Sequence, residues 1–297
     1  MATFLTRAEP DARPLVGVAL VALAVLFFAL GDVLTKGLTA RYPIPMIVAV
    51  RYLASLILLT VFVWPRLRSR LWKTERTGLV LLRGCTLALA SLTMGLALRL
   101  MPIGETIAIM YVSPFAVMAI AVPLLGEKVT PVGWFFAILG FCGVLLIMRP
   151  GGGLDPMGVL WALLNAACAT AYHLLTRVLS RTETSIAMIF HVTLVGAVFF
   201  TLSALPTLSG PLPSLPDFGA MVLLGMFATS GHFLFAVAYR HAPASLIAPV
   251  NYLHLVWAAL LGWLVFGDLP DGISMIGIAM IILAGVCLAV KSHLQRH

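Results

Sequence analysis

Apolar residues dominate this chain in ten long runs that are separated by short polar stretches. The runs lie at residues 15–35, 44–64, 78–98, 103–125, 131–149, 156–178, 184–206, 217–239, 244–266 and 271–291. A helix needs about 20 apolar residues to cross a hydrocarbon core of about 30 Å. Because the runs are continuous rather than alternating, they exclude the strands of a membrane barrel. The pattern predicts an all-α polytopic membrane protein with ten transmembrane helices.

The second half of the pattern repeats the first at an offset of 141 residues. The matched pairs include Arg99 and Arg240, Pro102 and Pro243, Tyr111 and Tyr252, Gly126 and Gly267, Gly17 and Gly158, and Gly84 and Gly225. The offset predicts two five-helix repeats, at 15–149 and 156–291, with a polar arm at 1–14 and a tail at 292–297. Five spans are an odd number, so the second repeat enters the membrane inverted. Inverted repeats with a solute site near the bilayer midplane are typical of secondary transporters.

Lysine and arginine lie mainly on one side of the predicted membrane, with 13 residues against 4 on the other side. The richest link, at residues 65–77, holds Arg66, Arg68, Arg70, Lys73 and Arg76. Cytoplasmic loops carry the excess of such residues. We therefore expect both termini in the cytoplasm and place the protein in the inner membrane as a multi-pass protein.

The composition agrees with this class, since 61% of the residues are hydrophobic and only 10% are charged. The net charge of +8 does not predict nucleic-acid binding, because no basic stretch is interleaved with stacking aromatics. The four cysteines fall inside apolar runs without a CxxC pair, which indicates small buried residues. We expect no metal site and no cofactor; the expected partners are the lipid bilayer and a small-molecule substrate.

The residues from Pro102 through Pro114 to Gly126 and Glu127, followed by glycines in the next span, resemble the drug/metabolite transporter superfamily. The glycines are Gly133, Gly140 and Gly143, and the second copy runs from Pro243 through Tyr252 to Gly267 and Asp268. The layout is similar to that of the ten-helix, duplicated (EamA-like) branch. Within this branch, the general similarity is greatest to bacterial exporters of amino acids, particularly aromatic ones. The resemblance implies export of small amphipathic metabolites, most of all amino acids, by alternating access. The alternative is export of other drugs or metabolites.

Small four-helix members of this superfamily carry a glutamate in their first helix that binds cations and protons. No acid stands in residues 16–31 of this chain. This difference favours a neutral or zwitterionic substrate.

Polar and aromatic residues within spans are the candidates for solute binding. In span 6, Trp161, Asn165, Cys168 and Tyr172 share one helical face, which is either a cavity lining or a packed stripe bonded to a neighbouring helix. The other candidates are Tyr111 in span 4, His232 in span 8, and Asn251, Tyr252, His254 and Trp257 in span 9. We expect the aromatic rings to hold the apolar part of a solute, and Asn165, Asn251 and His254 to hold its polar part.

Pro114 should kink span 4 and free the carbonyl of Met110, which makes it a candidate hinge. Leu255 stands at the matching position, so we expect no such kink in the second half. Asp32, Arg51 and Glu105 lie near the outer ends of their spans, either as an ion-pair gate or as charges that extend independently to water. For Arg83, near the inner end of span 3, extension to water is the favoured interpretation.

Other classes find less support. An intramembrane enzyme is disfavoured because the chain has no HExxH or GxSxG motif, so we expect no catalytic residues. A channel is disfavoured because no charge ring or carbonyl filter is visible. A carrier of nucleotide sugars or triose phosphates would need basic residues at the midplane, and Arg51 and Arg83 lie nearer the span ends. Spans 5 and 10 hold small residues instead of polar ones, which predicts peripheral packing or a homodimer face.

Overall fold

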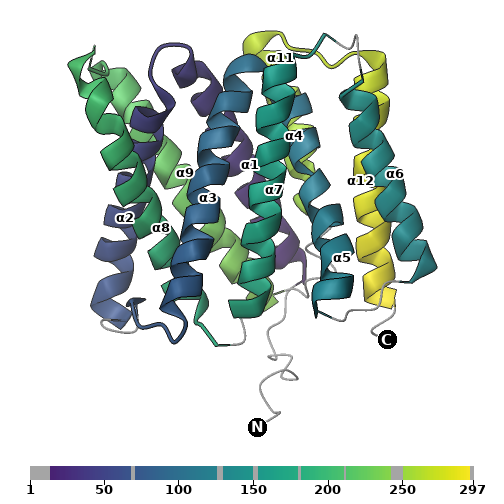
Figure 1. Cartoon of the computed structure of the whole chain (residues 1–297), viewed down its shortest axis with the longest axis horizontal. Helices are drawn as coiled ribbons and strands as arrows, with labels where there is room; N and C mark the ends of the chain where they lie inside the picture. Colours follow the sequence, from purple (N-terminus) through teal and green to yellow (C-terminus); the bar gives the residue numbers. More distant parts are fainter. Residues whose placement is uncertain are drawn as a thin grey trace.

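The computed structural model describes residues 14–67, 71–125, 130–149, 153–179, 182–210, 212–241 and 250–294. Within these ranges the chain is helical and has no strand (Figure 1). The helices are α1 (Pro14–Thr39), α2 (Ile44–Leu67), α3 (Thr77–Leu100), α4 (Ile103–Met110), α5 (Val112–Leu125), α6 (Pro131–Ile147), α7 (Pro156–Leu179), α8 (Ser185–Ala204), the 3-10 helix η2 (Leu205–Ser209), α9 (Leu215–His241), α11 (Leu253–Phe266) and α12 (Gly272–Leu294).

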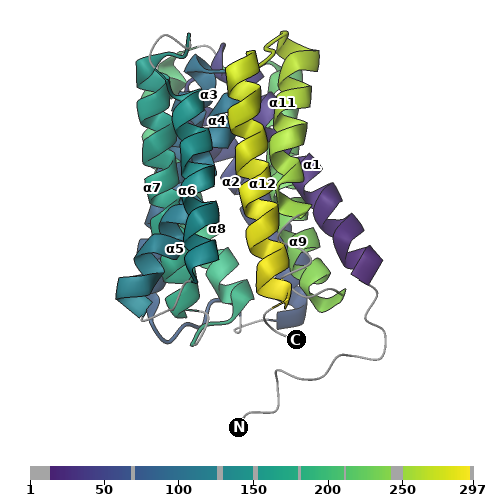
Figure 2. The same ribbon diagram turned by 90° about the vertical axis from the view of Figure 1, so that its right-hand side faces the viewer.

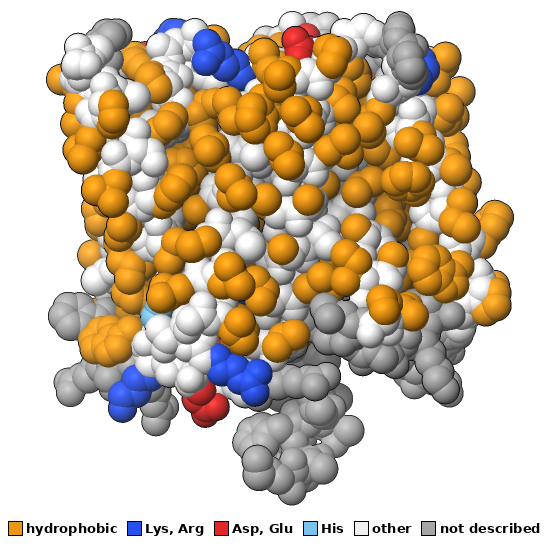
Figure 3. Space-filling model, viewed as in Figure 1, with side chains coloured by type: hydrophobic (Ala, Val, Ile, Leu, Met, Phe, Trp, Pro, Cys, Tyr) orange, Lys and Arg blue, Asp and Glu red, His pale blue; other side chains and the backbone are white. Residues whose placement is uncertain are grey.

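Seven helical segments in the described ranges are long and apolar enough to cross a membrane, and three more apolar helices are shorter, at 10–17 residues. The all-helical membrane class is therefore confirmed, while the number of ten spans stays a prediction. Hydrophobic side chains cover the face shown in Figure 3, and charged side chains gather at its upper and lower edges. This distribution suits an apolar belt in contact with lipid. We call the end where α1 begins and α12 ends the lower end, and the opposite end the upper end (Figure 1).

The two halves of the chain are related by an inverted pseudo-symmetry. Helix α1 begins at the lower end and α7, its counterpart, begins at the upper end (Figure 1). Helix α1 packs on α9 as α7 packs on α3, and α2 packs on α9 as α8 packs on α3. At residue level, Gly84 lies against the side chain of Val195, and Gly225 lies against that of Ala54. Gly225 follows Gly84 by 141 residues, and Val195 follows Ala54 by the same number. The repeat in the sequence is therefore also a repeat of packing contacts.

Helices α6 and α12 pack against each other within the chain (Figure 2). A Cβ atom at Gly143 would lie 2.6 Å from the carbonyl oxygen of Gly277, and one at Gly277 would lie 2.5 Å from that of Gly143. Gly140 in turn leaves room for the ring of Phe115. These small residues of the predicted spans 5 and 10 thus serve packing inside one chain, and a homodimer through these spans stays a prediction.

Both central helices are interrupted at the same position of their repeats. Tyr111 separates α4 from α5, and Tyr252 separates a helical segment that includes Asn251 from α11. The expectation that only the first half is interrupted was therefore wrong. No proline is needed at position 255, because the Leu255 N–H bonds to the Tyr252 carbonyl three residues back (3.1 Å) and the Tyr111 hydroxyl donates to the Asn251 carbonyl (2.9 Å). The Tyr111 hydroxyl, from the first half, thus replaces the backbone N–H that would bond to the Asn251 carbonyl in a continuous helix.

Asp271 caps the first turn of α12 at the upper end. Its Oδ1 accepts a hydrogen bond from the Ser274 N–H (2.7 Å), and its Oδ2 is paired with Arg149. These groups lower the pKa of Asp271 to about 2, the Ser274 backbone N–H most strongly. An acid with a lowered pKa in the folded state stabilises the fold above its ordinary pKa of 3.8, and the contribution is lost as the pH falls toward about 2.

We therefore expect Asp271→Asn to lower the melting temperature of the detergent-solubilised protein modestly at pH 6. The difference from the wild type should shrink as the pH falls from about 4 toward about 2, since the carboxylate of the unfolded wild type takes up a proton in this range before that of the folded protein does. Thermal denaturation followed between pH 6 and pH 3 tests this expectation, with the exposed Glu75→Gln as the control. A difference that stays constant over the whole pH range would contradict the assigned role.

Candidate functional site

The two helix interruptions meet at the centre of the bundle. The rings of Tyr111 and Tyr252 lie 5.1 Å apart between centroids, and the Tyr111 hydroxyl donates to the Asn251 carbonyl. Both tyrosines are buried. A backbone with free hydrogen-bonding groups is tolerated at membrane depth only where protein or a cavity satisfies it. The structure therefore brings three of the predicted site residues together where the two repeats touch.

A second contact between the halves joins Asp32 on α1 to His254 on α11. Asp32 Oδ2 and His254 Nε2 lie 2.9 Å apart, and both side chains are largely buried. The ring of His254 also lies 6.4 Å from that of Tyr111. The sequence left Asp32 either in an outer gate or extending to water and assigned His254 to solute binding, whereas the structure makes them partners. Only Nδ1 of His254 remains for a solute.

Phe28 connects this pair to α9. Its ring lies 6.3 Å from the His254 ring and 5.2 Å from the His232 ring. His232 is exposed, although it lies within a membrane-spanning helix. Phe28 does not stand out in the sequence because it is an ordinary member of an apolar run. Its position one helical turn before Asp32 was the available signal, since residues four apart share a helix face.

The predicted stripe of span 6 faces α3. The Asn165 amide nitrogen donates to the Ala90 carbonyl (2.7 Å), and the Tyr172 hydroxyl accepts a hydrogen bond from Arg83 (2.6 Å). At these two positions the stripe serves contact between helices, one of the two alternatives that the sequence left open. Asn165 is only 4% exposed, and its Oδ1 has no hydrogen-bond partner among the described residues. Trp161, on the same helix, packs against the central core.

Arg83 is buried, with 3% exposure, and does not extend to water as the sequence analysis expected. Its Nε donates to the Thr176 hydroxyl (2.6 Å), its Nη1 to the Met188 carbonyl (3.0 Å) and its Nη2 to the Tyr172 hydroxyl. The guanidinium also stacks on the Tyr172 ring at 4.2 Å. Acceptors on α7 and α8 thus take the place of water. The periodicity of span 3 alone does not reveal them, because they lie on other helices.

The three charges of the predicted gate do not form one cluster. Arg51 Nη2 donates to the Ser91 hydroxyl (2.8 Å), and Asp32 is paired with His254. Glu105 is 4% exposed, and its Oε2 has no hydrogen-bond partner in the part of the chain that the structure describes. A gate function of these residues stays a prediction.

The upper end is instead held by an ion pair that the sequence analysis did not single out. Lys36 Nζ lies 2.9 Å from Asp268 Oδ2 and donates to the Met101 carbonyl at 2.7 Å. Lys36 and Asp268 both act electrostatically on the buried Glu105. The pair joins the end of α1 to the turn after α11, and so it crosses between the two halves.

Two other candidates lie beside this centre. Trp257 packs against a small core of Val21, Val25 and Ala238, and its Nε1 is buried with no partner among the described residues. Pro114, the predicted hinge, lies in the first turn of α5 with an exposed side chain. Neither residue has a polar contact in the structure that assigns it a role.

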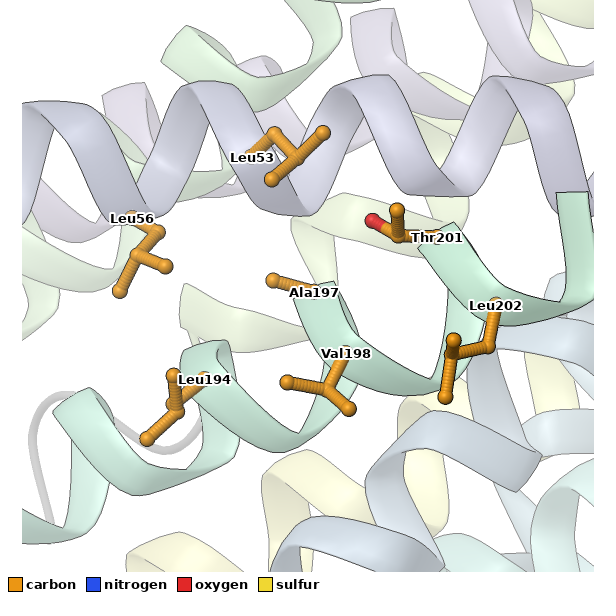
Figure 4. A pocket seen from close by; sticks show the side chains of 7 residues that line it. All are labelled: Leu53, Leu56, Leu194, Ala197, Val198, Thr201 and Leu202. Carbon is orange, nitrogen blue, oxygen red and sulfur yellow. The ribbon is translucent and has the colours of Figure 1, made fainter. Parts of the chain in front are cut away.

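An apolar groove of about 280 Å³ between α2 and α8 is separate from this centre (Figure 4). Leu53 and Leu56 line one side, and residues of α8 line the other, with the Thr201 hydroxyl as the one polar side-chain group of the lining. Leu53 is exposed on the outer surface, among the side chains that suit lipid contact. The groove therefore lacks the polar groups that a solute site needs.

Comparison with known proteins gives a family. A family model described as the EamA-like transporter family matches the chain twice, over residues 15–149 and 156–290. A solved crystal structure shares the fold with a TM-score of 0.65, covering 94% of this chain and 98% of the other at 20% identity.

Curated relatives are named as transporters of several compounds. The chain is 28% identical to a riboflavin transporter of Brucella anthropi, over 88% of this chain and 94% of the relative. It is 24% identical to a pseudopaline exporter of Pseudomonas aeruginosa, over 92% and 95%. It is 25% identical to an S-adenosylmethionine uptake transporter of Rickettsia bellii, over 91% and 91%.

Proposed function

Because the chain belongs to the EamA-like transporter family, we propose that it is a secondary carrier that moves a small amphipathic metabolite by alternating access between its two halves. It is a multi-pass protein of the inner membrane. The observation that supports the carrier most is the pair of interrupted helices that meet at Tyr111 and Tyr252. Discontinuous helices at the interface of inverted repeats form the solute site in many secondary transporters.

The proposed solute is a planar heterocyclic metabolite rather than a plain amino acid. Riboflavin and S-adenosylmethionine, named for two relatives, each join a flat ring system to a polar tail. The site offers rings from several helices for the flat part, and the unpartnered Asn165 Oδ1 and Trp257 Nε1 for polar groups. The residues proposed to contact solute are Tyr111, Trp161, Asn165, Tyr172, His232, Asn251, Tyr252 and Trp257. His254 is assigned to the pair with Asp32 instead of to solute contact.

The excess of lysine and arginine supports a cytoplasmic position for the lower end. The ion pair of Lys36 and Asp268 would then lie at the outer mouth and close it in the conformation seen here. Pro114 and the interruption at Tyr111 supply the hinge of the first half. The relatives are named for export as well as uptake.

A transport assay with purified protein in liposomes tests the proposal. The panel consists of riboflavin, S-adenosylmethionine, tryptophan and alanine, each measured as saturable counterflow. We expect counterflow of at least one heterocyclic compound at a rate above that of alanine. Equal rates for alanine and the heterocycles would contradict the substrate class, and no counterflow of any compound would contradict the carrier.

Removing the hydroxyl that joins the two halves should slow transport. Tyr111→Phe keeps the ring but loses the hydrogen bond to the Asn251 carbonyl, which is worth about 0.5–1.5 kcal/mol. If the bond stabilises the rate-limiting conformation, the transport rate should fall by up to about tenfold. Initial rates of counterflow measure the change. Tyr42→Phe, which loses a hydroxyl bonded to Asp217 at the upper end, is the control and should keep most of the rate.

A further inference from the structure

The buried contact between Asp32 and His254 has the chemistry of a proton-binding site. We propose that this pair binds the proton whose gradient drives transport, an inference that rests on the proposed carrier function. The pair comprises an acid and an imidazole 2.9 Å apart, and its side chains are 16% and 10% exposed. It joins α1 of the first half to α11 of the second.

A single proton changes the charge balance of this pair. With neutral His254 and ionised Asp32, the pair carries one uncompensated negative charge inside the membrane-spanning bundle. An isolated buried carboxylate is costly, and the cost falls when an opposite charge is hydrogen-bonded to it. A proton taken up by the imidazole supplies that charge, since His254 then donates Nε2–H to Asp32 and the pair becomes neutral overall. Histidine is the side chain that makes such an exchange at physiological pH.

The surroundings leave the pair without another charged partner. From α4, Tyr111 faces the His254 ring, and from α9, His232 reaches it through Phe28. Tyr252 lies on the same chain segment as His254, and Lys36, one turn along α1, is paired with Asp268. Within the described residues no second acid or cation lies at hydrogen-bond distance from the pair. Its charge therefore depends on its own proton.

Proton occupancy then acts on the contact between the two halves. A hydrogen bond between an imidazolium and a carboxylate is reinforced by the attraction of two opposite charges, whereas a neutral imidazole supplies no charge to attract the carboxylate. Proton binding thus tightens the link between α1 and α11, and proton release loosens it, next to the interruption at Tyr252. The repeat-related positions of Asp32 and His254 hold His173 and Ser113, which include no acid. The sequence repeat therefore supplies no second copy of this pair.

The test compares Asp32→Asn and His254→Gln with the wild type in liposomes, with riboflavin or the panel compound that is carried fastest as the probe. Two rates are measured: accumulation under an imposed pH gradient of either sign, and counterflow at equal pH on both sides. We expect the wild type to accumulate the probe several-fold above equilibrium. Both variants should lose this accumulation and still carry out counterflow. Asp217→Asn, which removes an acid paired with Arg41 at the upper end, should keep both.

Any other outcome of these measurements contradicts either the proton site or the carrier function. Wild-type counterflow without any response to a pH gradient overturns the proton site and leaves the carrier intact. Accumulation of the probe by both variants at the wild-type level also overturns the proton site and leaves the carrier intact. Loss of counterflow together with accumulation in both variants, with normal folding by gel filtration, assigns the pair to transport itself and also overturns the proton site. Absence of wild-type counterflow for every panel compound overturns the proposed carrier function instead.

Discussion

Gly285→Ala is expected to reduce transport by more than tenfold and to lower the free energy of unfolding by about 1–3 kcal/mol. Gly285 lies on α12 directly against the ring of Tyr252, and a Cβ atom there would lie 1.7 Å from Tyr252 Cζ. No side-chain adjustment of an alanine can relieve this overlap, so the ring must move. Its displacement breaks the tilted ring contact with Tyr111, which is worth about 0.5–1.5 kcal/mol, at the point where the two halves meet.

Counterflow rates and thermal denaturation measure this effect, and two controls separate it from a general effect of alanine. Gly262→Ala, in the interior of α11, places a Cβ at an ordinary 3.6 Å from Ile103 and should be tolerated. On a Tyr252→Ala background, Gly285→Ala should add little, because the overlapping ring is already gone. Full activity of Gly285→Ala in the wild-type background would show that Tyr252 does not occupy this space.

Arg83→Gln should give the second large effect, a loss of about 2–4 kcal/mol of stability. The guanidinium connects α3 to α7 and α8 through three acceptors, and glutamine cannot reach all of them. The abandoned hydroxyl and carbonyl groups would stay buried without a donor. Lysine should not restore stability either, since a single ammonium group lacks the planar fork that serves acceptors on two helices.

Thermal denaturation of the detergent-solubilised protein measures the loss. Arg76→Gln is the matched control, because Arg76 stands at the start of the same helix with an exposed side chain. A melting temperature of Arg83→Gln within about a degree of the control would contradict the role of Arg83 as a connection between helices. Rescue by Arg83→Lys would point to the charge alone rather than to the fork geometry.

The helices follow closely from the hydrophobic pattern, since a lipid solvent leaves few alternatives to apolar helical runs. The predicted run at 156–178 corresponds to α7 (Pro156–Leu179), and the run at 78–98 corresponds to α3 (Thr77–Leu100). The interruptions were harder to predict. Proline at position 114 drew attention to the first half, whereas the second interruption depends on a hydroxyl from the other half that no local pattern contains.

Candidate site residues were easier to select than their partners. Asp32 and His254 were both singled out because polar groups are costly within a membrane, but they are 222 residues apart in sequence. Their pairing depends on how α1 and α11 are rotated toward each other. The same reason explains why Arg83 was assigned to water: its three acceptors come from two distant helices. The periodicity of a sequence predicts which residues share one face of a helix, but it does not predict which other helix packs against that face.

The bond between Tyr111 and Asn251 constrains the evolution of its two ends unequally. Its donor is a side chain that one nucleotide change can remove, whereas its acceptor is a main-chain carbonyl that every residue possesses. Drift at position 251 can therefore alter the asparagine side chain without breaking the joint between the halves. Position 111 has no such freedom. A duplicated gene with this arrangement can diversify one copy of the central helix while the other is kept under selection.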